Sequence, residues 1–232
     1  MHYGLSPSFI RIIRRSGVHA LASIAPAFAA AAFAWIGSAA LAGSPAGAAT
    51  LQINEILAGP ARDWDGSGAF SSRDDEWVEL KNVTAAPLDL TGFIVTDGDS
   101  LPRLALTGTL ASGERRMVFG KESYDWERAH GFPAFGLSLG NSGDAVLLWH
   151  VDGADTTLVD AYAYRSHEAA ADRAVGRLND DGPWTLFDAL NPYTGTLTPS
   201  GTGCDPSPGA KNSCAVTSVR RSSWGVLKSL YR

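Results

Sequence analysis

Three runs of the chain alternate apolar with polar residues, which is the pattern of half-buried β-strands: Leu51–Leu57, Glu76–Asn82 and Leu88–Asp97. Polar turn residues follow the second and third runs, and the connections leave no room for crossover helices, so we expect an antiparallel sheet. Glu55 lies among the apolar positions of the first run. It either belongs to a site or accepts hydrogen bonds from backbone amides, and we expect the structural role because a buried carboxylate needs donors.

Further strands follow with similar alternation as far as Phe187. They are predicted at Arg103–Leu106, Glu114–Phe119, Ala145–His150, Thr156–Tyr164, Val175–Leu178 and Trp184–Phe187. The second of them is expected to follow the first through a turn at residues 107–113, and Glu122–His130 predicts one or two helical turns. Many short strands at this spacing predict an all-β fold, an antiparallel β-sandwich of immunoglobulin-like type, over residues 50–188.

Residues 1–49 have a different composition and are predicted to be a secretory signal peptide. Three arginines and no acidic residue precede an alanine-rich apolar run that extends from Val18 to Ala42. Small residues follow the run. Cleavage near Ala48-Ala49 exports the mature chain to the periplasm, the cell surface or the medium. The alternative is an uncleaved membrane anchor, because the run is long enough to span a bilayer, although Pro26 interrupts it.

Removal of this leader makes the chain more acidic. The whole sequence has 19 basic and 24 acidic residues and a formal charge of −5. Three of the basic residues lie in the leader, which leaves 16 basic against 24 acidic residues and a charge of −8. Binding of nucleic acid through bulk electrostatics requires a basic surface, so we expect no nucleic-acid partner.

Both cysteines lie near the C-terminus, in a segment dominated by Pro, Gly, Ser and Thr. In an oxidising compartment Cys204 and Cys214 are expected to form a disulfide that closes a small loop. Their spacing excludes a CxxC-type metal or redox site. The composition predicts a linker or a loosely folded tail over residues 189–219.

The last 13 residues, 220–232, contain four basic residues and no acidic one. Three interpretations are open: disorder, a short helix that docks on a partner or a membrane surface, and a terminal sorting signal. The segment is too short to cross a bilayer. The residues expected to mediate docking or sorting are Arg220, Arg221, Trp224, Leu227, Lys228 and Tyr231.

An acidic insert between the first two strands has the spacing of a twelve-residue calcium loop that begins at Asp63. Gly68 at position six permits the sharp turn that such loops need. The candidate calcium ligands are Asp63, Asp65, Ser67, Ala69, Ser71 and Asp74. Position twelve is an aspartate in place of the usual glutamate, Ser67 is a weak ligand, and strands replace the usual flanking helices. The alternative is a solvated acidic insert without a metal.

Other residue patterns indicate no catalytic site. His130, His150 and His167 are scattered and lack zinc-ligand spacing. Trp64 and Trp126 lie outside the strand patterns and are candidate ligand-facing aromatic residues, so a carbohydrate-binding module is an alternative function. We expect a protein that is not an enzyme.

An ordered set of motifs resembles the lamin-tail domain in the form found in exported bacterial proteins. No single motif is specific, and the resemblance lies in their order along residues 51–187. The motifs are Ile53–Ile56, Asp75–Asn82, Leu88–Phe93, Leu139–Asp144, and Val159–Asp160 followed by Tyr162 or Tyr164.

The resemblance implies an immunoglobulin-like sandwich that acts as a binding or interaction module, with an unknown protein or a surface polymer as partner. It implies no common catalytic residues. Bacterial members are sometimes joined to nucleases or other hydrolases, so an accessory domain or a divergent member of a secreted hydrolase or nuclease system is a second alternative. Calcium is the one cofactor that the sequence suggests. Contact with a membrane is expected only through the C-terminal tail or an uncleaved leader.

Overall fold

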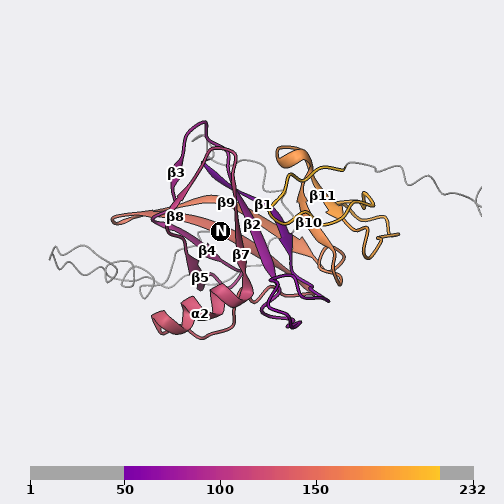
Figure 1. Cartoon of the computed structure of the whole chain (residues 1–232), viewed down its shortest axis with the longest axis horizontal. Helices are drawn as coiled ribbons and strands as arrows, with labels where there is room; N and C mark the ends of the chain where they lie inside the picture. The colour runs from indigo at the N-terminus through magenta and orange to yellow at the C-terminus, as the bar shows by residue number, and fades with distance from the viewer. Residues whose placement is uncertain (1–49, 215–232) are drawn as a thin grey trace, which may run out of the picture.

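The computed structural model describes residues 50–214, which form a β-sandwich of two main antiparallel sheets with one α-helix at its side (Figure 1). Sheet A has the strand order β11-β10-β1-β2-β7, and sheet C has the order β5-β4-β8-β9. The strands of sheet A are β1 (Leu51–Leu57), β2 (Trp77–Asn82), β7 (Arg115–Phe119), β10 (Ala174–Arg177) and β11 (Trp184–Phe187). The strands of sheet C are β4 (Phe93–Thr96), β5 (Pro102–Ala105), β8 (Gly143–Asp152) and β9 (Asp155–Arg165).

The inner faces of sheets A and C enclose the main hydrophobic core. Val78 and Leu80 of β2 are fully buried there, together with Val95 of β4 and Leu148 of β8. Successive side chains of a strand point to opposite faces, so the alternating pattern directs one apolar set from each sheet toward the other. The predicted antiparallel sandwich of immunoglobulin-like type is therefore confirmed.

The run Leu88–Asp97, predicted as one strand, is two strands in different sheets. β3 (Leu88–Asp89) pairs with β6 (Thr109–Leu110) in a small separate sheet, whereas β4 pairs with β5 and β8. A turn at Gly92 separates them. The φ of 89° at Gly92 is unfavourable for other residues, and a Cβ atom there would lie 2.7 Å from the carbonyl oxygen of Val151.

The two strands on either side of residues 107–113 do not pair with each other. β5 belongs to sheet C and β7 to sheet A. The connection between them contains β6, which pairs with β3 in the small separate sheet, so the chain passes from sheet C to sheet A there. The helix α2 (Gly120–His130) follows β7 directly and is longer than predicted. It ends at Gly131, which has a left-handed conformation and donates its N–H to the carbonyl oxygens of the last turn.

Residues 189–214 are docked on sheet A and do not form the loose tail that their composition predicts. The carboxylate of Asp188 accepts N–H groups from Tyr193, Thr202 and Gly203, and Thr202 also bonds to the carbonyl oxygen of Leu186. Residues rich in Gly and Ser are mobile when their amides face water, but here these amides have partners in the fold. The 3₁₀ helix η1 (Leu178–Asp180) precedes β11.

Cys204 and Cys214 form a disulfide with a Cα–Cα distance of 5.5 Å, as predicted. The predicted signal peptide at residues 1–49 and the basic tail at residues 220–232 lie outside the described residues. Within residues 50–214, no helix is long and apolar enough to span a membrane.

Candidate functional site

The acidic insert between β1 and β2 forms a loop organised around Asp75, whose side chain is fully buried. One carboxylate oxygen of Asp75 accepts the N–H groups of Trp64 at 2.6 Å and Asp65 at 2.9 Å. The other accepts the N–H of Ser71 at 2.7 Å. Because Asp75 lies two residues before β2, these bonds tie both halves of the loop to the start of that strand.

Two further carboxylates converge on Asp75. The Oδ2 atom of Asp63 accepts the N–H of Gly68 at 2.7 Å, and the φ of 90° at Gly68 permits the turn that brings this amide back. One ligand oxygen each from Asp63, Asp65 and Asp75 lies within 4.8 Å of the other two. Carboxylate oxygens are the ligands that Ca²⁺ prefers. Among residues 50–214, no other set of three or more His, Cys, Asp or Glu side chains brings its ligand atoms this close together.

Asp74, predicted as the ligand at position twelve, points elsewhere. Its Oδ1 atom accepts a hydrogen bond of 2.6 Å from Nε of Arg73, which lowers the pKa of Asp74. The predicted ligands Ser67 and Ser71 also make local bonds: the Ser67 hydroxyl donates to the carbonyl oxygen of Ala69, and Oγ of Ser71 accepts the N–H of Asp74. The third carboxylate of the group is therefore Asp75 and not Asp74.

Trp64, predicted as a ligand-facing aromatic residue, is half-buried and fastens the base of the loop. Its ring packs edge-on against Trp77 with the centroids 6.1 Å apart, and its Nε1 donates a hydrogen bond of 2.8 Å to Asp172. Asp172 also accepts bonds from Nε of Arg62 and N–H of Ala61, both at 2.9 Å. The indole nitrogen of Trp64 is thus engaged within the fold.

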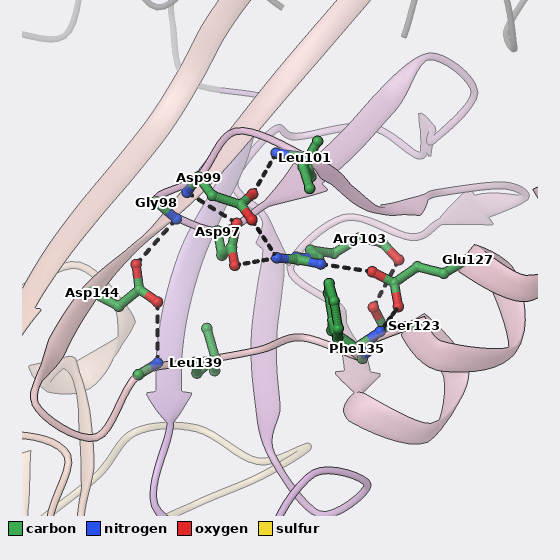
Figure 2. Close-up of polar contacts among 12 residues, drawn as sticks. Asp97, Gly98, Asp99, Leu101, Arg103, Ser123, Glu127, Phe135, Leu139 and Asp144 are labelled. Atoms are coloured by element: carbon green, nitrogen blue, oxygen red, sulfur yellow. Dashed lines mark hydrogen bonds and ion pairs between the residues drawn. The ribbon is translucent and has the colours of Figure 1, made fainter. Parts of the chain in front are cut away.

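A second cluster of charges lies where β4, β5 and α2 meet (Figure 2). The guanidinium of Arg103 is 1% exposed and contacts Glu127 at 2.8 Å, Asp97 at 2.5 Å and Asp99 at 2.9 Å. The second oxygen of Glu127 accepts the N–H groups of Phe135 and Gly136. Arg103 therefore connects sheet C to α2 and, through Glu127, to the loop that follows the helix.

Two other carboxylates at this end of the sandwich also bind backbone amides. Asp144 accepts the N–H of Gly98 at 3.1 Å (Figure 2). It also accepts the N–H of Gly140 at 3.1 Å and so joins two loops. Glu76 accepts the N–H of Leu139 at 3.2 Å, and burial raises the pKa of Glu76 to about 8 despite that bond. These carboxylates hold loops in place.

The sequence profile of the family described as Lamin Tail Domain matches residues 44–166, which is more than half of the chain. The chain belongs to the lamin tail domain family. The match covers β1 to β9, with the 63–75 loop and Arg103 inside it. No curated protein matches the sequence. In this lamin tail domain, β10 and β11 follow the matched residues, yet β10 pairs with β1 inside sheet A.

Lamin tail domains are immunoglobulin-like interaction modules that are generally not catalytic. The other predicted aromatic residue, Trp126, lies on α2 and is half-buried. Two rings stack on it: His130 with a centroid distance of 4.4 Å and Phe132 with 5.5 Å. Phe135, in the loop after the helix, is 55% exposed. Trp126, His130 and Phe132 therefore form a stacked aromatic surface at the C-terminal end of α2.

The sequence patterns did not identify Asp75 or Arg103 as site residues, for two different reasons. The calcium template ends at its twelfth position, so Asp75 fell one residue beyond it, although its place just before a predicted strand was a usable signal. Arg103 lies in a strand pattern whose three carboxylate partners come from two other segments. No local spacing identifies such a cluster.

Proposed function

We propose that this lamin tail domain is an exported, non-enzymatic interaction module that binds a protein or a surface polymer outside the cytoplasm. The family match carries the proposal, because the family is one of interaction modules. The Cys204–Cys214 disulfide supports export, since such bonds persist in oxidising compartments. The charged side chains at one end of the sandwich support a module without catalysis, because Arg103, Glu127 and Asp144 are engaged in holding strands, loops and helix together.

We propose further that the 63–75 loop binds Ca²⁺ through Asp63, Asp65 and Asp75. The convergence of their oxygens within 4.8 Å supports this assignment. The carboxylate of Asp75 is already fixed by three amides, so the ion has one preorganised ligand. Extracellular modules bind calcium with dissociation constants on the order of 10⁻⁴–10⁻³ M, which suits an exposed loop outside the cell. The role of the ion is to order the loop, and the loop forms part of the interaction surface.

Binding to the cell envelope tests the proposed function. The purified mature chain is mixed with washed envelopes of the producing cells and sedimented, in millimolar calcium and in chelator. We expect the protein to pellet with the envelopes at a saturable level, and less so in chelator. The double variant Asp63→Asn with Asp65→Asn should behave in calcium as the wild type does in chelator. Asp125→Asn, on the exposed side of α2, is the matched control. Absence of saturable binding in both conditions would contradict the proposal.

A carbohydrate-binding module is the alternative that one observation favours, namely the stacked aromatic surface at Trp126. Aromatic faces bind sugar rings, but two protein rings already stack on Trp126. A glycan array on the purified chain decides between the two functions. Binding that Trp126→Ala abolishes would support the carbohydrate module, and a blank array would leave the protein or polymer partner. A partner that is a secreted hydrolase or nuclease fits the interaction module equally.

A further inference from the structure

The segment Cys204–Cys214, called the strap below, covers the outer face of sheet A. In Figure 1 it lies beside β10 and β11. Leu57 and Trp77 on this face form a small apolar cluster with Phe187, and Cys204 packs against it. Glu55 and Glu79 are directly opposite each other on β1 and β2 and belong to the same face.

Three carboxylates of the sandwich accept main-chain N–H groups of the strap. Glu55 accepts the N–H of Ser207 at 3.1 Å and its hydroxyl at 2.8 Å. Glu79 accepts the N–H of Gly209 at 2.6 Å, and Asp180 of η1 accepts that of Asn212 at 2.9 Å. These bonds follow one another along the strap, so acidic side chains hold it at three successive points.

The approach of the strap to the sheet is close at Gly176 of β10. A Cβ atom at this position would lie 2.9 Å from Nδ2 of Asn212 and 2.9 Å from Cγ of Glu55. The absence of a side chain lets the strap cover Glu55 completely, and Glu55 is 0% exposed. Water therefore reaches Glu55 only when the strap lifts.

The cations near this face do not neutralise Glu55. Arg115 of β7 pairs with Asp180 and lies 3.5 Å from Glu79, and Lys81 of β2 pairs with Asp180 at 3.1 Å. Among residues 50–214, Glu55 has no ion-pair partner by the same distance criterion. The charged residues of the strap itself, Asp205 and Lys211, are exposed. Glu55 thus shares a buried site with two other carboxylates and no cation of its own.

We propose that the strap is a proton-dependent latch, which is closed while the Glu55 carboxyl group is protonated and opens to uncover the outer face of sheet A when Glu55 becomes charged. The latch is independent of the calcium site. Glu79 and Asp180 remain held by Arg115, Lys81 and Asn54, so Glu55 is the group whose charge decides the position of the strap.

The sign of the pH dependence follows from burial. With the strap docked, burial raises the pKa of Glu55 to about 8, although the bonds from Ser207 lower it and the charges of Glu79 and Asp180 raise it further. With the strap lifted, Glu55 is solvated and titrates near the ordinary 4.5. The docked state therefore binds more protons, so docking is strongest below about pH 4.5 and weakens as the pH rises through about 8.

Hydrogen exchange of the three bonded amides, Ser207, Gly209 and Asn212, tests the latch in the full mature chain. Protection factors are measured at pH 5.5 and pH 8.5 and corrected for the intrinsic pH dependence of exchange. We expect them to fall by at least about tenfold between these pH values, because the equilibrium changes tenfold for each pH unit in which one proton is released. The factor for Leu148 in sheet C reports global unfolding, to whose pH dependence Glu76 also contributes, so a variant of Glu55 is needed to separate the two.

The variant Glu55→Gln keeps an acceptor for Ser207 but has no charge. We expect its strap amides at pH 8.5 to be as protected as those of the wild type at pH 5.5. Glu114→Gln, at an exposed glutamate, is the control and should follow the wild type. Equal wild-type protection at both pH values would overturn the latch. So would a fall of the strap protection in Glu55→Gln as large as in the wild type, because that fall would come from groups other than Glu55, such as Glu76. If Glu55→Gln does not fold, equal wild-type protection at the two pH values still overturns the latch.

Discussion

Arg103 of β5 and Glu127 of α2 form an ion pair at 2.8 Å in which both side chains are at most 1% exposed (Figure 2). Such a pair gains little net free energy over two apolar residues, since both ions lose their hydration. Removal of one partner is much more costly, because it leaves a buried charge without compensation. The pair therefore serves to fix α2 against sheet C.

We expect Arg103→Met to lower the free energy of unfolding by about 3–5 kcal/mol, because it leaves Asp97 and Glu127 buried without their cation. Urea denaturation followed by tryptophan fluorescence measures the change. Lys121→Met is the matched control, since it breaks an exposed pair with Asp125 and should cost less than about 1 kcal/mol. Equal losses in the two variants would show that the Arg103 cluster does not hold the helix.

The two adjacent aspartates of the loop should differ in their effect on calcium. Isothermal titration calorimetry should show calcium binding in the wild type and in Asp74→Asn, because Asp74 is paired with Arg73. Binding should be lost in Asp63→Asn and in Asp75→Asn. Retention of binding in Asp75→Asn together with its loss in Asp74→Asn would restore the assignment made from sequence spacing.

Asp75 should also stabilise the protein without calcium. Its carboxylate accepts three backbone N–H groups from a fully buried position, and a carboxamide has only one acceptor oxygen. We expect Asp75→Asn to lower the free energy of unfolding by about 1–3 kcal/mol in chelator. Asp63→Asn, which affects exposed hydrogen bonds, should change it by about 0.5 kcal/mol or less. Thermal unfolding in chelator measures both values.

Glu76 should make the protein less stable as the pH rises. Its pKa is about 8 in the folded state against 4.5 for the ordinary group, so the folded state binds more protons. The protonated Glu76 side chain contributes its full share of the free energy of unfolding below about pH 4.5, and this share is lost as the pH rises to about 8. We expect Glu76→Gln to remove roughly 2–4 kcal/mol of the decline between pH 5 and pH 8. Urea denaturation series at several pH values measure this, and parallel profiles for variant and wild type would contradict it.

Loss of the disulfide should destabilise the strap first. The bond closes a loop with a sequence separation of 10, and such loops contribute about 2–3 kcal/mol by limiting the unfolded chain. We expect the double variant Cys204→Ser with Cys214→Ser to lose about this much. Trypsin should then cut it faster after Lys211, which is exposed on the strap. Unchanged cleavage would show that the bonds to Glu55, Glu79 and Asp180 hold the strap without the disulfide.

The sequence was sufficient to predict that Glu55 accepts hydrogen bonds from backbone amides, but it did not identify the residue that donates them. A carboxylate among apolar residues must find hydrogen-bond donors, so backbone amides were expected. The donor is Ser207, 152 residues further along the chain. Similarly, acidic residues around Gly68 indicated a loop with converging oxygens, whereas the fold selected Asp75 over Asp74. Adjacent residues point in different directions, and only the start of β2 fixes which of them faces inward.

The alternation of apolar and polar residues determined the strands and the sandwich by itself. A period of two defines an apolar face for each strand, and burial of those faces requires a second sheet. Only the tertiary structure decided which segments meet. It split Leu88–Asp97 at Gly92, placed β5 and β7 in different sheets, and docked residues 189–214 on sheet A. The physical reason is that hydrogen bonds and ion pairs such as Arg103–Glu127 join groups that are distant in sequence. The local composition around each group does not predict its partner.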